Sequence, residues 1–139
     1  GDAGAYLLGA LIAAGLIIFQ KNQGFSPWYV LMVLIYPVTE VICSFVRKVI
    51  FRNKSAMQPD GLHFHMLIYK RISKKIGFRK IRLRHLIVTI FIFMINFPFL
   101  IFANLYAKDT FMLMIVCFWY VLVYLSIYLI LLPKYIFKK

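Results

Sequence analysis

Two histidines, His63 and His65, lie just after the sequence Pro59-Asp60-Gly61, separated from it by Leu62. In an extended chain both imidazoles would lie on one side, whereas in a helix they would point in nearly opposite directions. The apolar residues that follow repeat every four positions as far as Gly77, which predicts an amphipathic helix on the membrane surface with Asp60 as its N-cap. Imidazoles beside a helix start, in a basic segment, favour a phosphate-bearing ligand. The sequence does not decide whether Asp60 caps this helix or has a functional role.

Two further carboxylates could carry chemistry, Glu40 and Asp2. Glu40 lies in an apolar segment, three residues after Pro37. A charge in such a segment is costly and usually faces a bundle interior or a wet cavity, and Pro37 predicts a broken or bent helix. Either a functional carboxylate beside that bend or a structural ion pair with an arginine would account for Glu40. Asp2, next to Gly1 and Gly4, could cap a helix, the favoured reading from this residue alone, or hold Mg²⁺ through oxygen.

The elements that must position these groups are membrane helices. Of the 139 residues, 63% are hydrophobic and 15% are charged, which excludes an ordinary soluble domain and a disordered chain. A helix needs about 20 mainly apolar residues to cross a bilayer. The sequence predicts an all-α, polytopic membrane helical bundle with a cytoplasmic amphipathic helix and four transmembrane helices, at 3–19, 28–46, 86–106 and 111–132. Small residues on one face of the first span predict that it packs inside the bundle.

The basic residues give this bundle an orientation. Twelve of the 17 Lys and Arg residues lie in the segment 47–85, where Asp60 is the only acid. Cytoplasmic loops collect basic residues, so we expect this segment and both termini at the cytoplasmic face. Such a segment suits membrane lipids with anionic headgroups and phosphate-bearing substrates. Nucleic acid is disfavoured, because the segment is held at the membrane and carries no recognised nucleic-acid-binding motif. The sequence leaves open whether the chain forms a homodimer.

Three motifs, in order, resemble those of the polyprenyl-phosphate N-acetylhexosamine-1-phosphate transferases, a glycosyltransferase family. They are Gly1-Asp2-Ala3-Gly4-Ala5 at the end of a small-residue span, Pro37-Val38-Thr39-Glu40 followed by Arg47-Lys48, and Pro59-Asp60-Gly61-Leu62-His63-Phe64-His65-Met66-Leu67. The resemblance covers essentially all 139 residues, and the histidine segment is its most specific part. Many members have another histidine at the position of Met66, so the role of a third histidine is not carried over.

The resemblance implies a Mg²⁺-dependent reaction at the bacterial cytoplasmic (inner) membrane. N-acetylhexosamine-1-phosphate passes from a UDP-N-acetylhexosamine, such as UDP-N-acetylglucosamine, to undecaprenyl phosphate, and UMP is released. The product serves cell-envelope polysaccharides, among them cell wall and lipopolysaccharide O-antigen. The resemblance implies that Asp2 binds the metal and that His63 and His65 are catalytic and bind substrate phosphate. Arg47 and Arg52 are further candidates for contacts with the phosphates.

The paired aspartates and the nucleotide-site loop of the family lie upstream of its Gly-Asp motif and are absent from these 139 residues. We therefore expect residues 1–139 to be the C-terminal membrane portion of a larger transferase, without activity alone. The alternative is a non-enzymatic membrane module. A broken span with Glu40 would suit a transporter fragment, and the basic helix would suit an anionic-lipid-binding scaffold.

Overall fold

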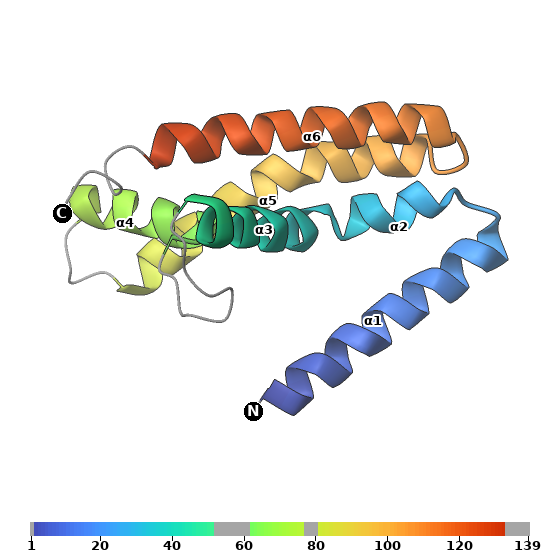
Figure 1. Ribbon diagram of the computed structural model, residues 1–139, viewed down its shortest axis with the longest axis horizontal. Coiled ribbons are helices and arrows are strands. Elements are labelled where there is room, and N and C mark those ends of the chain that lie inside the picture. The colour runs from blue at the N-terminus through green and yellow to red at the C-terminus, as the bar shows by residue number, and fades with distance from the viewer. Residues whose placement is uncertain (1, 52–61, 77–80, 133–139) are drawn as a thin grey trace.

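The computed structural model describes residues 2–51, 62–76 and 81–132, and every regular element within them is helical (Figure 1). The elements are α1 (Asp2–Gln23), α2 (Pro27–Val33), α3 (Ile35–Val46), a short π-helix η1 (Arg47–Phe51), α4 (Phe64–Ile76), α5 (Ile81–Leu105) and α6 (Thr110–Leu131). The predicted all-α fold class is confirmed.

Three of these helices, α1, α5 and α6, are long and apolar enough to cross a membrane. Helices α2 and α3 meet at a bend of 73° and make a fourth span if the pair is counted as one. The predicted spans 3–19, 86–106 and 111–132 correspond to α1, α5 and α6, and the span 28–46 corresponds to the α2–α3 pair. Helix α5 begins at Ile81 rather than at 86, so that Arg84 and His85 lie within it.

The bend between α2 and α3 comes at Leu34, whose backbone angles (φ −97°, ψ 9°) leave the helical region. Pro37 stands in the first turn of α3, where a missing amide removes no hydrogen bond within the helix. The break predicted around Pro37 is therefore confirmed, and it falls just before the proline. Because of this break, α3 runs in a different direction from α2, and the direction of α3 determines which groups the Glu40 side chain contacts.

The two short connections of the bundle lie together at one end (Figure 1). Ser26 caps α2, because its Oγ accepts the amide of Trp28 at 3.3 Å. The amide of Ser26 also donates to the carbonyl of Ala107 at 2.8 Å, and its hydroxyl pairs with that of Thr110 at 2.9 Å. The α1–α2 and α5–α6 turns are thus tied to each other, while α4 lies at the opposite end.

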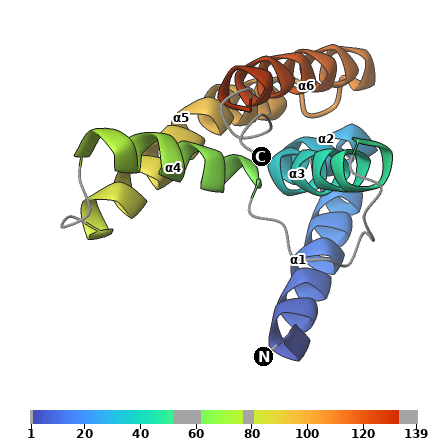
Figure 2. The same ribbon diagram turned by 60° about the vertical axis from the view of Figure 1, so that its left-hand side comes forward.

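Helix α1 projects away from the other helices (Figures 1 and 2). It contacts α2, and the rings of Phe19 and Phe25 meet edge to face near the turn, with centroids 5.7 Å apart. On the small-residue face of α1, Ala5 and Gly9 are exposed, and a Cβ added at Gly9 would meet nothing within 4 Å. The prediction that the small-residue face of this span packs inside a bundle is therefore wrong for the part of the chain that the structure describes.

Helix α6 turns a stripe of tyrosines, Tyr120, Tyr124 and Tyr128, into the bundle. All three are buried, and their rings stack with centroids 6.4 and 6.1 Å apart. A spacing of four residues places them on one helix face. The hydroxyl of Tyr120 donates to Oδ1 of Asn96 in α5 at 2.9 Å. The other two hydroxyls reach the candidate site.

Asp109 caps α6, since its Oδ1 accepts the amides of Phe111 at 3.0 Å and Met112 at 3.1 Å. We expect Asp109→Ala to lower the free energy of unfolding by about 1 kcal/mol, because two amides at the helix start lose their acceptor. Denaturant unfolding in detergent micelles measures the loss. Asp109→Asn keeps an oxygen acceptor and is expected to lose less. Equal losses for the two variants would contradict the capping role.

Candidate functional site

His63 and His65 stand together at the start of α4. Helix α4 begins at Phe64, and the carbonyl of His63 accepts the amide of Leu67 at 2.9 Å. The two imidazoles stack, with centroids 5.8 Å apart and ring planes 14° from parallel. They therefore lie on one side, as expected for an extended entry into the helix. His65 is exposed and the side chain of His63 is 34% exposed, so both rings are within reach of a ligand.

The carboxylate of Glu40 in α3 holds this helix start. Its Oε1 accepts the backbone amide of Phe64 at 2.8 Å and lies 3.0 Å from Nδ1 of His63, and its Oε2 accepts the hydroxyl of Tyr124 at 2.6 Å. Because a carboxylate only accepts, Nδ1 of His63 donates here and Nε2 is left for another partner. Glu40 thus caps α4 from another helix, with its charge at the positive end of the helix dipole.

These contacts revise two predictions. Among the described residues, the ion-pair partner of Glu40 is His63 and not an arginine. Because α4 begins at Phe64, Asp60 is not its N-cap, and the capping carboxylate is that of Glu40. Asp60 itself, like Arg52, lies outside the described residues, so their predicted functional roles stay predictions.

Arg47, the first residue of η1, is buried against the same segment, with 6% of its surface exposed. Its Nη1 donates to the carbonyl of Leu62 at 3.0 Å and to the hydroxyl of Tyr128, and its Nη2 donates to Oγ of Ser44 at 3.4 Å. The Tyr128 hydroxyl also lies 3.2 Å from the Leu62 carbonyl oxygen. Arg47 thus holds the Leu62 carbonyl and the Tyr128 hydroxyl, and its predicted contact with phosphate stays a prediction.

The apolar face of α4 packs on protein. Phe64, Leu67 and Ile68 are buried, and α4 contacts both α5 and α6. The ring of Phe64 lies against that of Tyr124, with centroids 4.7 Å apart. The amphipathic helix is confirmed, but its apolar side rests on the bundle, and α4 runs alongside the first part of α5 in both views (Figures 1 and 2). The helix start that carries the histidines is thereby anchored.

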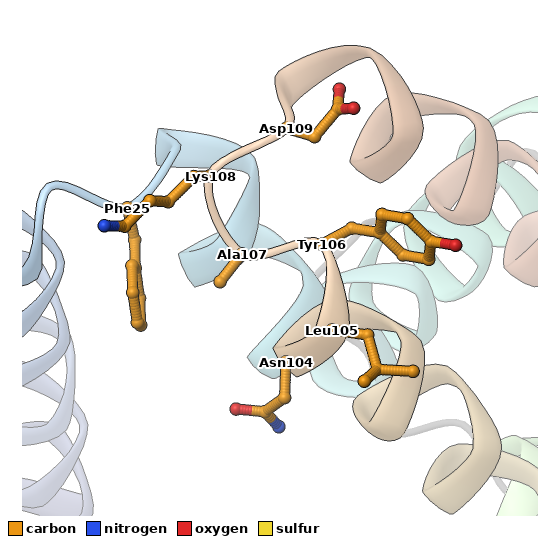
Figure 3. A pocket seen from close by; sticks show the side chains of 7 residues that line it. All are labelled: Phe25, Asn104, Leu105, Tyr106, Ala107, Lys108 and Asp109. Carbon is orange, nitrogen blue, oxygen red and sulfur yellow. The ribbon is translucent and has the colours of Figure 1, made fainter.

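An apolar cavity of 590 Å³ lies between α3 and α6. Arg47 and Tyr128, which contact Leu62, also line it, and most of its other lining residues are apolar, among them Ile42, Leu125 and Leu129. A second hollow, of 320 Å³, lies at the opposite end around the α5–α6 turn (Figure 3). None of the predicted site residues lines that hollow. The histidine end of the bundle is therefore the candidate site.

The described residues contain no complete magnesium site, and the predicted role of Asp2 stays a prediction. Within them, no group of three or more His, Cys, Asp or Glu side chains is close enough to hold a metal ion. Helix α1 begins at Asp2, and its amino end lies apart from α4 in both views (Figures 1 and 2). The structure thus does not bring Asp2 together with His63 and His65, and we derive no step through a metal.

The chain is similar to a known transferase. Over 75 residues it is 31% identical to the undecaprenyl-phosphate alpha-N-acetylglucosaminyl 1-phosphate transferase of Thermotoga maritima. The match covers 53% of this chain but 24% of that relative, so it spans about a quarter of the relative's length. No protein-family model matches the chain, and no solved structure does. Together with the apolar helices, this likeness indicates a membrane protein related to transferases.

The sequence analysis missed two residues of the site, Tyr124 and Tyr128. In a span rich in aromatic residues they look like ordinary apolar side chains at the membrane. The available signal was their spacing, because tyrosines at 120, 124 and 128 share one face of α6. A buried tyrosine hydroxyl needs a partner, and that need would have predicted polar groups opposite this face.

Proposed function

We propose that the chain belongs to a transferase that moves N-acetylhexosamine-1-phosphate from a UDP-sugar to undecaprenyl phosphate and releases UMP. The observation that carries this proposal is the stacked pair His63 and His65 at the anchored start of α4. The likeness to the Thermotoga maritima transferase supports the reaction class and the lipid acceptor.

In this proposal the two histidines bind a substrate phosphate. Phosphate oxygens only accept, so His63 would bind them as an imidazolium, which donates to Glu40 through Nδ1 and to phosphate through Nε2. The exposed ring of His65 stacks beside it and can donate to the same group. Phosphoryl transfer depends chiefly on positioning and on neutralising charge. Both reactants are polyanions, and α4 carries Lys and Arg without a single acid. The segment therefore has the charge that attracts both.

The cavity between α3 and α6 suits the lipid acceptor. Its lining is mostly apolar, as an isoprenoid chain requires, and Arg47 and Tyr128 connect it to the histidine segment through Leu62. We propose that part of the isoprenoid chain lies in this cavity, with its phosphate toward His63 and His65.

The proposal places the histidine end at the cytoplasmic face of a bacterial cytoplasmic membrane, with both termini on that side. It also takes the chain as the carboxyl-terminal portion of a larger enzyme, whose Mg²⁺ site has Asp2 as one ligand. The basic residues at the end that carries α4 support the orientation, and the match to a quarter of a longer relative supports a portion of a larger enzyme.

The test uses the complete gene product that carries these 139 residues. Purified in lipid nanodiscs with UDP-N-acetylglucosamine or another UDP-N-acetylhexosamine and undecaprenyl phosphate, it is expected to release UMP in the presence of Mg²⁺ and to stop when EDTA removes the metal. The 139-residue chain alone is expected to release none. Absence of UMP from the complete protein would refute the transferase and favour a non-enzymatic module. Release by the 139-residue chain would refute its assignment as a portion of the enzyme.

A further inference from the structure

We propose that α6 sets the position of the two histidines, with Tyr124 and Tyr128 as positioning residues that act through Glu40 and Leu62. The inference rests on the proposed function only for what the histidines do when they are in place. The positioning itself can be measured without any turnover.

The first contact runs from Tyr124 through Glu40. The Tyr124 hydroxyl donates at 2.6 Å to Oε2, a short bond typical of a hydroxyl on a carboxylate. It fixes the rotation of the carboxylate, so that Oε1 stays in place for the Phe64 amide and for Nδ1 of His63. The Glu40 side chain is only 13% exposed, so water is a poor substitute for the hydroxyl.

The second contact runs from Tyr128 to Leu62, the residue before His63. The Leu62 carbonyl oxygen accepts hydrogen bonds from the Tyr128 hydroxyl at 3.2 Å and from the Arg47 guanidinium at 3.0 Å. Glu40 holds the amide of Phe64 on the other side. His63 therefore sits between two fixed peptide groups, and both depend on hydroxyls one helical turn apart on α6.

Tyr120 supplies a matched control from the same stripe. It is as deeply buried as Tyr124, at 1% exposure, and its ring stacks on that of Tyr124. Its hydroxyl, however, donates to Asn96 of α5 and not to the histidine segment. Replacement of each tyrosine by phenylalanine keeps the ring and removes only the hydroxyl. A difference between positions 120 and 124 therefore reports the contact with Glu40, not the packing of α6.

The first experiment measures hydrogen exchange of the amides of residues 62–68 in the full chain in nanodiscs. We expect Tyr124→Phe and Tyr128→Phe to raise the exchange rate of this segment about tenfold, because its anchoring bonds open more often. Tyr120→Phe is expected to leave the segment as in the wild type. Unchanged exchange in Tyr124→Phe and Tyr128→Phe, or an equal rise in Tyr120→Phe, would overturn the inference.

The second experiment measures turnover of the complete gene product. Tyr124→Phe is expected to lower kcat about tenfold while the KM for the UDP-sugar stays within about twofold, since a misplaced histidine weakens the transition state more than the ground state. In a His63→Ala background, Tyr124→Phe is expected to add little, because the residue through which it acts is gone. A full additional loss there would overturn the positioning role. An inactive wild type would refute the proposed function, while the exchange result would still decide the inference.

Discussion

Glu40→Ala is expected to lower the free energy of unfolding by about 3 kcal/mol, the largest loss of stability that we predict for a single side chain of this bundle. The carboxylate serves three donors at once: the Phe64 amide, Nδ1 of His63 and the Tyr124 hydroxyl. Alanine would leave all three without their acceptor. The Tyr124 hydroxyl is the most costly of them, because that side chain is almost fully buried. Denaturant unfolding of the chain in detergent micelles measures the loss.

Glu40→Gln is the matched control for this stability prediction. The amide keeps the length of the side chain and one oxygen acceptor, but its NH₂ group meets a donor where the second carboxylate oxygen stood. We expect about half the loss of the alanine variant. A Glu40→Ala protein that unfolds within about 0.5 kcal/mol of the wild type would show that water replaces the carboxylate, and would contradict the account of Glu40 as the cap of α4.

The case of Glu40 shows how far the sequence alone can reach. The cost of a buried charge predicts that Glu40 faces the bundle interior or a wet cavity, and Pro37 predicts the break that the structure places at Leu34. The partner of the carboxylate depends on where the chain returns 23 residues later, which no local pattern encodes. Of the two alternatives that the sequence leaves open for Glu40, the ion pair names an arginine as the partner. The structure instead brings a histidine and an open helix start to the same oxygen atom.

Arg47 and α1 are two further cases in which the local sequence does not identify the contact partner. A basic residue beside the histidine segment is predicted to contact phosphate, but a guanidinium can equally bind carbonyl and hydroxyl oxygens, and Arg47 is buried in doing so. Small residues on α1 permit a close approach of another helix but do not bring one. Whether a helix face can accept a neighbour follows from its local sequence, whereas which helix packs there depends on the rest of the fold.

His63→Ala and His65→Ala are each expected to lower turnover of the complete gene product at least about tenfold, which is about 1.4 kcal/mol of transition-state stabilisation. The two variants should differ in stability. The ring of His63 donates to Glu40, so its loss is expected to cost about 1 kcal/mol of folding free energy. His65 is exposed, and in the described part of the chain its ring contact is the stack with His63, so we expect a change within about 0.5 kcal/mol.

The difference in stability between the two variants distinguishes a phosphate-binding role of the histidines from a purely structural one. If His63 served only to satisfy Glu40, its replacement would lower stability without a specific loss of turnover, and His65→Ala would change neither quantity. If the stacked pair binds phosphate, both variants lose turnover although only one loses stability. His85→Ala is the control, since that ring lies against Tyr69 in the α4–α5 hairpin with centroids 4.9 Å apart. Turnover of the control is expected to stay within about twofold of the wild type. Full turnover in His65→Ala would contradict the phosphate-binding role of that ring.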